Sequence, residues 1–202
     1  LPADYAFPAD RLADPHPQVR LAALLALADR PADSLAPAVV DPLVAMAADP
    51  DVHKDRWLPD AVTSAAAVHS EAFLGQVLAS STPQIDRSAA APIVRIVAEH
   101  RAREGLSDEA LNGLLASLQH APAPLTHAVL AGFVKGWPKN RPAVLLPATE
   151  QALAAALPNL GPEGRVQLLR LADVFQSTAL REEAKAVLVT LAATIKDTSG
   201  SD

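Results

Sequence analysis

The fold is decided at Asp14-Pro15-His16-Pro17-Gln18-Val19-Arg20-Leu21-Ala22-Ala23-Leu24, where a turn leads into an amphipathic run. Pro17 suits the first position of a helix, since its missing N–H has no intrahelical partner there. The apolar residues that follow recur at helical spacing, which predicts a helix over 17–28. A second Asp-Pro pair stands at Asp49-Pro50, roughly 35 residues further on. This period is typical of repeats built from helical hairpins.

The remainder of the chain continues as short helical segments separated by Pro, Gly and capping residues. No segment alternates between apolar and polar residues over the length of a strand, so we expect almost no β structure. The predicted fold class is all-α, a right-handed superhelix of about five antiparallel helical pairs. Further helices are expected over 35–48, 55–68, 70–79, 86–103, 107–119, 126–134, 166–175 and 177–196, with 141–157 kinked or split at Pro147.

The two ends of the chain differ in character from this helical region. Residues 1–11 hold two Pro and two aromatic residues and are expected to form an extended arm. Residues 12–196 form the helical repeat domain, and the small polar residues 197–202 are expected to be a disordered tail. The chain starts at Leu1 without an initiator Met, and we expect it to be part of a larger protein.

Composition excludes several classes of function. The 202 residues include no Cys, which rules out disulfides, a thiolate zinc site, a cysteine nucleophile and haem attachment through CxxCH. A net charge of −6 gives no reason to expect nucleic acid as a partner, because a phosphate binder needs a basic face. No apolar run approaches the ~18 residues that cross a bilayer, so direct membrane insertion is not expected.

The stretch from Asp14 to Leu24 resembles the first helix of a HEAT repeat, whose usual form is Asp-Pro, a polar residue, Val-Arg, then Ala-Ala and Leu. Arg20 matches the HEAT arginine, and Asp14 matches the inter-helix aspartate. The resemblance implies an armadillo-like α-solenoid in which such residues join neighbouring repeats and perform no chemistry. The structural repeat residues it points to here are Asp14, Val19, Arg20, Asp49 and Asp55.

A narrower resemblance rests on the segments 55–66, 73–74 and 131–136, which are similar to the HEAT region of large bacterial membrane-bound dehydrogenase-like proteins. Those proteins join a β-propeller dehydrogenase-like domain, HEAT repeats and a c-type cytochrome domain. This chain has no CxxCH and no propeller repeats, so only the HEAT part is represented. The resemblance implies a periplasmic or secreted location and carries over no haem or dehydrogenase residue.

The reactive side chains form no recognisable catalytic or metal-binding pattern. The six His include no HExxH pair, and the Ser residues lack a GxSxG elbow. Most carboxylates stand where helices are expected to begin, a placement that capping explains. We therefore expect no catalytic residue, no cofactor and no metal ion.

Two groups of residues are candidates for contact with a partner. Arg56 and Trp57 lie in a polar cluster at a helix start, and Trp57 is either a core residue between two repeats or an exposed anchor. The second group is the basic cluster 135–141, either a solvated loop or a contact for an acidic partner. Its candidate contact residues are Lys135, Trp137, Lys139 and Arg141.

These observations favour a non-catalytic scaffold or protein-interaction module. Its partner would be another protein or another domain of the same chain. The second helix of each pair, including 35–48 and 70–79, is expected to form the binding surface. The alternative is the structural HEAT portion of a periplasmic oxidoreductase, placed between a dehydrogenase domain and a haem domain.

Overall fold

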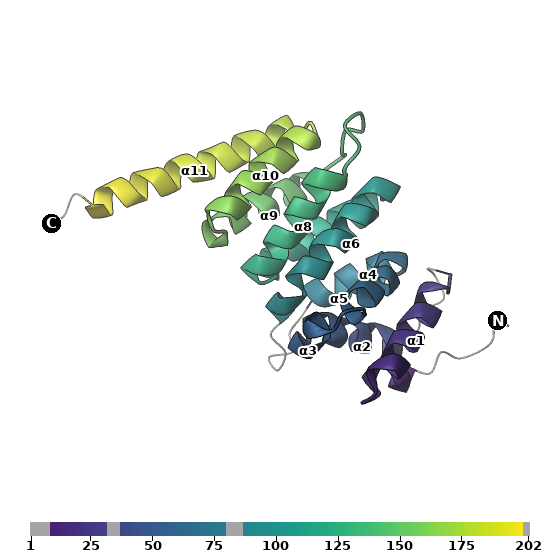
Figure 1. Ribbon diagram of the computed structural model, residues 1–202. Helices are drawn as coiled ribbons and strands as arrows, with labels where there is room; N and C mark the ends of the chain where they lie inside the picture. The colour runs from purple at the N-terminus through teal and green to yellow at the C-terminus, as the bar shows by residue number, and fades with distance from the viewer. Residues whose placement is uncertain (1–8, 32–36, 80–86, 200–202) are drawn as a thin grey trace.

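The structure is a computed structural model that describes residues 9–31, 37–79 and 87–199. All regular structure in these ranges is helical and none is strand (Figure 1), which confirms the all-α prediction. Of the expected extended arm, residues 9–11 lie in the 3₁₀ helix η1 (Ala9–Ala13), and 1–8 lie outside the described residues. At the other end α11 (Thr178–Ser199) includes residues 197–199, which were assigned to the tail, and 200–202 are outside the described residues.

Most of the expected helices are present, with shifted ends. The helix expected over 141–157 begins at Pro147, and the segment 141–146 that precedes it is not helical. The sequence pattern did not predict the short helix α3 (Pro50–Lys54). The other α-helices are α1 (Pro17–Ala28), α2 (Pro37–Ala48), α4 (Leu58–Val68), α5 (Ser70–Leu78), α6 (Ala91–Glu104), α7 (Asp108–Ser117), α8 (Ala123–Gly136), α9 (Pro147–Ala156) and α10 (Pro162–Val174).

Proline placement explains where these helices begin. Pro fixes φ near the helical value and lacks the N–H that the first turn leaves unpaired, so it favours helix starts. Most helices carry Pro at their first or second position, as Pro17, Pro59 and Pro162 illustrate. Pro42, inside α2, is an exception.

The helices pack in two rows that follow the order of the chain. In the first row α1 contacts α4, α4 contacts α6, α6 contacts α8, and α8 contacts α10. In the second row α2, α5, α7, α9 and α11 contact one another in the same order. Figure 1 shows this progression as a change of colour from the purple end to the yellow end, where α11 projects beyond its neighbours. Each helix therefore buries its apolar side chains mainly against helices that are near it in sequence.

The tightest packing in the first row is between α6 and α8. A Cβ placed on Gly132 would lie 2.5 Å from the carbonyl oxygen of Arg95 and 2.8 Å from the amide nitrogen of Glu99. A Cβ on Gly136 would collide with the carbonyl oxygen of Glu99. The two glycines are four residues apart and lie on the same face of α8. Their missing side chains allow the backbones of the two helices to touch.

Candidate functional site

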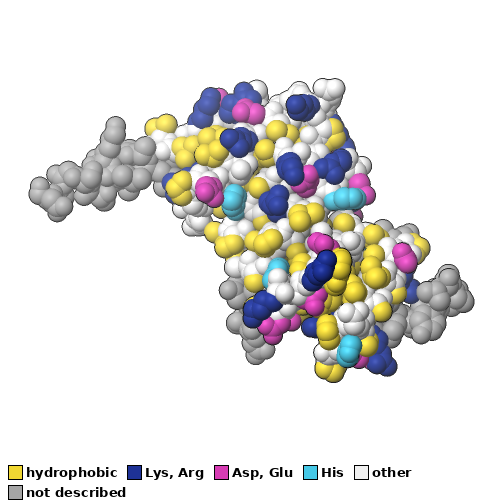
Figure 2. All heavy atoms as spheres, in the orientation of Figure 1, with side chains coloured by type: hydrophobic (Ala, Val, Ile, Leu, Met, Phe, Trp, Pro, Cys, Tyr) yellow, Lys and Arg dark blue, Asp and Glu magenta, His cyan; other side chains and the backbone are white. Residues whose placement is uncertain are grey.

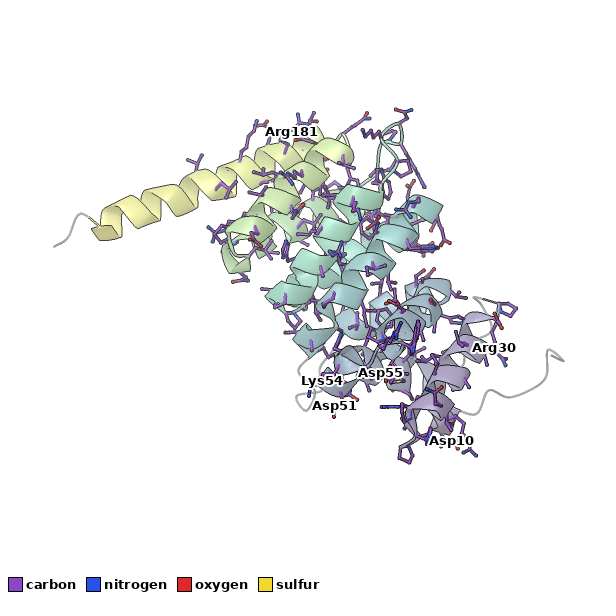
Figure 3. All side chains as sticks on the ribbon, viewed as in Figure 1. Asp10, Arg30, Asp51, Lys54, Asp55 and Arg181 are labelled. Atoms are coloured by element: carbon purple, nitrogen blue, oxygen red, sulfur yellow. The ribbon has the colours of Figure 1, made fainter. Side chains whose placement is uncertain are left out.

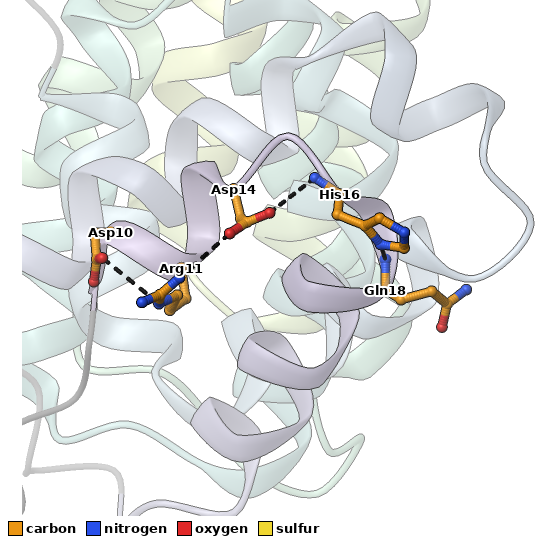
Figure 4. Close-up of polar contacts among 5 residues, drawn as sticks. All are labelled: Asp10, Arg11, Asp14, His16 and Gln18. Atoms are coloured by element: carbon orange, nitrogen blue, oxygen red, sulfur yellow. Dashed lines mark hydrogen bonds and ion pairs between the residues drawn. The ribbon is translucent and has the colours of Figure 1, made fainter.

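The aspartates assigned to the repeats form hydrogen bonds at turns. Asp14 accepts a hydrogen bond from the backbone N–H of His16 at 2.9 Å and pairs with Arg11 at 3.5 Å (Figure 4). Asp49 is the N-cap of α3 and accepts from the N–H of Asp51 at 2.8 Å. These carboxylates satisfy N–H groups at or just before helix starts, which would otherwise have no partner.

Arg20 on α1 forms an ion pair at the turn that opens α3. Its guanidinium lies 3.9 Å from the carboxylate of Asp49, and its side chain is only 20% exposed. The hydrogen bond from Lys54 lowers the pKa of Asp51, and the backbone N–H groups of Trp57 and Leu58 lower that of Asp55; the charge of Arg20 adds a small effect to both. Figure 3 shows Asp51 and Asp55 close together near the α3 turn. Val19, next to Arg20 on α1, is half-buried.

We predict that Arg20→Ala lowers the melting temperature by about 2–4 °C without altering any activity. The variant loses the contact with Asp49 and the packing of the arginine stem on α1. Thermal unfolding followed by circular dichroism measures the change, with Arg95→Ala, an exposed arginine on α6, as the control. Equal melting temperatures for Arg20→Ala and the unmodified chain would refute a contribution of the Arg20–Asp49 contact to stability.

Trp57 stands exposed at the start of α4. Its side chain is 52% accessible, and the guanidinium of Arg56 lies 4.6 Å from the ring centroid, over one face. The carboxylate of Asp55 accepts hydrogen bonds from the N–H groups of Trp57 at 2.7 Å and Leu58 at 3.0 Å, and these bonds lower the pKa of Asp55. Of the two alternatives for Trp57, the geometry corresponds to the exposed one.

The basic cluster 135–141 divides into core and surface residues. Trp137 is 4% exposed and packs edge-on against Phe175, with ring centroids 4.7 Å apart, and it also stacks on Phe133. Its indole N–H donates to the carbonyl of Arg141. Trp137 is therefore buried, and its side chain does not offer the contact with a partner that the sequence predicts. The side chain of Lys139 is exposed.

The two other basic residues of this cluster form contacts within the fold. Arg141 donates to the carbonyl of Leu106 and lies over the Trp137 ring. Lys135 on α8 pairs with Glu99 on α6 at 2.9 Å, and Arg103 pairs with the same carboxylate at 2.6 Å. The hydrogen bond from Lys135 is the largest influence lowering the pKa of Glu99, and Arg103 adds to it, while burial opposes them.

We predict that this pairing makes the stability of the chain sensitive to acid. The pKa of Glu99 is lower in the folded chain than its ordinary value of 4.5. The ionised carboxylate therefore contributes fully to the free energy of unfolding above pH 4.5, and this contribution is lost as the pH falls through the folded-state pKa. Glu99→Gln should lower the free energy of unfolding at neutral pH, and the free energy of this variant should fall less steeply than that of the unmodified chain as the pH is lowered. Denaturant unfolding at pH 3 to 7 measures both effects, and parallel pH curves for the two proteins would contradict the assignment.

Asn112 on α7 is a structural residue that the sequence did not reveal. Its side chain is 6% exposed. The amide nitrogen donates to the carbonyls of Asp108 at 2.8 Å and Val144 at 2.9 Å, and the amide oxygen accepts from the N–H of Leu146 at 2.8 Å. Asn112 thus ties the non-helical segment 141–146 to α7. Only its polar character within an apolar helix face could have indicated this role.

We predict that Asn112→Ala destabilises the fold by about 2–3 kcal/mol, because the change removes partners from the backbone groups of Val144 and Leu146. Asn112→Asp should recover none of the loss, because the carboxylate still accepts from Leu146 but places its second oxygen, in a buried site, against the carbonyls of Asp108 and Val144. Urea unfolding of the three proteins gives the ranking. An alanine variant as stable as the original would show that Asn112 does not hold the segment.

Exposed large apolar side chains lie along the first row of helices. Figure 2 shows hydrophobic side chains gathered over the part of the molecule where Figure 1 places α1 and α4. The binding surface predicted from the sequence lies instead on helices of the second row, such as α2 and α5. Large apolar residues exposed on the first row are Leu25 (α1), Trp57 (start of α4), Ile96 (α6) and Val166 (α10), and the others in the described ranges are Val144, Leu146 and Val189.

Two open cavities lie along the first row of helices. One, of about 480 Å³, lies where α8 and α10 begin and is lined mainly by small residues, with His127 and Glu163 as its polar members. The other, of about 320 Å³, lies between α1 and α4 and includes Leu25 and Trp57. Within the described ranges, no group of three or more His, Asp or Glu side chains is arranged to hold a metal ion.

None of the described helices combines the length and the apolarity needed to cross a membrane. Comparison with known proteins adds no relative: no protein-family model matches the chain, and no curated protein or solved structure is significantly similar to it.

Proposed function

We propose that the chain is a non-catalytic scaffold or protein-interaction module, built as a right-handed HEAT-like solenoid of helical pairs. The observation that carries the proposal is the packing of two rows in which each helix contacts the next of its row. Such stacking lets a chain present a long, continuous surface to a partner. The partner is another protein or another domain of the protein that contains this chain.

The link from Arg20 to Asp49 supports the repeat character of this architecture. It joins the first helix of one pair to the turn that opens the next pair. In a stack of repeats, stability comes from the units and from the interfaces between neighbours. Polar residues that fix one pair against the next contribute to shape, and shape is what a scaffold provides.

Photo-crosslinking in the producing cell tests the proposal. A photoreactive phenylalanine analogue is placed at Leu25, Ile96 or Val166 on the first row, and at Val144 or Val189 elsewhere, all of which are exposed. We expect positions on one surface to give a discrete crosslinked product, either with a second protein or within a longer parent chain. A uniform absence of products from every position would contradict a role in interaction.

A further inference from the structure

The cavity between α1 and α4 is an open groove with apolar walls and one polar edge. Leu25 and Trp57 leave about half of their side-chain surface to solvent, at 51% and 52%. The lining extends from the first turns of both helices to their middle. Its apolar members are Leu21, Leu25, Trp57 and Ala61, and its polar members are Gln18, Asp60 and Ser64.

The position of Trp57 in this groove is fixed by its neighbours. The carboxylate of Asp55 accepts hydrogen bonds from the backbone N–H groups of Trp57 and Leu58. The side chain of Leu58 is 1% exposed, so it anchors the start of α4 in the core. Arg56 covers one face of the indole ring. A side chain that is already ordered loses little entropy when a partner binds. Trp and Arg are also the residues most often found at the energetic centres of protein interfaces.

The charge of the groove indicates the charge of its ligand. Asp60 is the only ionisable residue of the lining, and no ion pair is found for it among the described residues. The first hundred residues of the chain carry 13 acidic and 7 basic side chains, whereas the remaining 102 carry ten of each. A carboxylate without an ion pair at the edge of an apolar groove favours a ligand that brings a cation to it.

We propose that the groove binds an amphipathic helix of a partner protein, with a Lys or Arg directed at Asp60. This inference rests on the proposed function and specifies its surface and the chemistry of its partner. A helix suits the groove because side chains at i and i+4 project from one face and pack between two neighbouring helices. Leu25 and Trp57 receive the two apolar side chains, and Asp60 receives the cation.

A displayed library of helix-forming peptides tests the proposal on the full chain. Eight positions of a fixed helical frame are randomised, and binders are selected against the chain and sequenced. We expect the enriched peptides to combine an apolar pair at i and i+4 with at least one Lys or Arg. Trp57 is exposed and Trp137 is buried, so binding should shift the fluorescence of Trp57 to the blue.

Variants of the chain locate the binding site. Trp57→Ala and Leu25→Ser should each weaken an enriched peptide at least tenfold, while Val144→Ser, at another exposed apolar position, should not. Asp60→Lys should weaken the same peptide, and replacing the peptide's cation with Glu should restore binding to that variant. Circular dichroism confirms that each variant is folded.

Several results would overturn the proposal: no enriched peptide, enriched peptides that lack a cation, or binding that survives both Trp57→Ala and Leu25→Ser. Peptides that bind helices of the second row would refute this groove and leave the interaction module standing. Failure of the interaction module itself would appear in the crosslinking experiment, as an absence of products from all positions.

Discussion

We expect Gly132→Ala to lower the free energy of unfolding by about 3 kcal/mol. An alanine Cβ at this position would lie 2.5 Å from the carbonyl oxygen of Arg95 and 2.8 Å from the Cβ of Ala98. Both obstacles belong to α6, where a backbone carbonyl cannot rotate away as a flexible side chain can. The two helices must separate, and the contacts between them are lost along their length. Urea unfolding followed by circular dichroism measures the loss.

Gly113→Ala on α7 is the matched control, because a Cβ added there meets nothing within 4 Å. In that open position alanine should stabilise the helix by roughly 0.5–1 kcal/mol, as it usually does in place of an interior glycine. The two substitutions are chemically identical, so their opposite signs isolate the close approach of α6 and α8. A stabilising effect at Gly132 would show that the helices are further apart than described.

The second large effect is expected at Trp137. Trp137→Ala should cost about 3–5 kcal/mol, because it empties a site that Phe133 and Phe175 surround. It also removes the indole N–H that donates to the carbonyl of Arg141. The segment that follows Trp137 should then loosen from α10. Guanidinium unfolding gives the loss, and hydrogen exchange of residues 137–146 reports the loosening.

Trp57→Ala provides the contrast within the same chain. With 52% of its side chain exposed, Trp57 contributes little buried area, and its replacement should change stability by less than about 1 kcal/mol. Comparing the two variants therefore distinguishes the structural role expected of Trp137 from the binding role proposed for Trp57. Equal losses of stability for the two variants would place Trp57 in the core and would remove the basis of the groove proposal.

The sequence predicts the helices well, because their starts depend on local chemistry. Pro17 stands in the first turn of α1 as expected, and Gly105 ends α6 with a φ of 95°. Ends are less well predicted where a neighbour in space decides the outcome. Residues 141–146 carry a helical apolar pattern, but Asn112 and Phe175 bind their backbone in a non-helical form.

The candidate site depends even more on contacts between distant residues. Trp57 and Trp137 both stand beside basic residues at helix ends, so their sequence surroundings are alike. Their exposures differ because Phe175, 38 residues after Trp137, covers one of them. The groove likewise needs α1 and α4 side by side, and neither helix alone shows an apolar pair bordered by Asp60.

The most direct test of the account is whether helices far apart along the two rows stay out of contact, as the stacked order requires. The chain has no Cys, so Leu25→Cys on α1 accepts a single nitroxide label at an exposed site. Paramagnetic relaxation should then broaden the amide signals of α4 and leave those of α8 and α10 unchanged. Broadening of α8 or α10 would mean that the chain closes into a bundle, and it would contradict the stacked arrangement on which the proposed function rests.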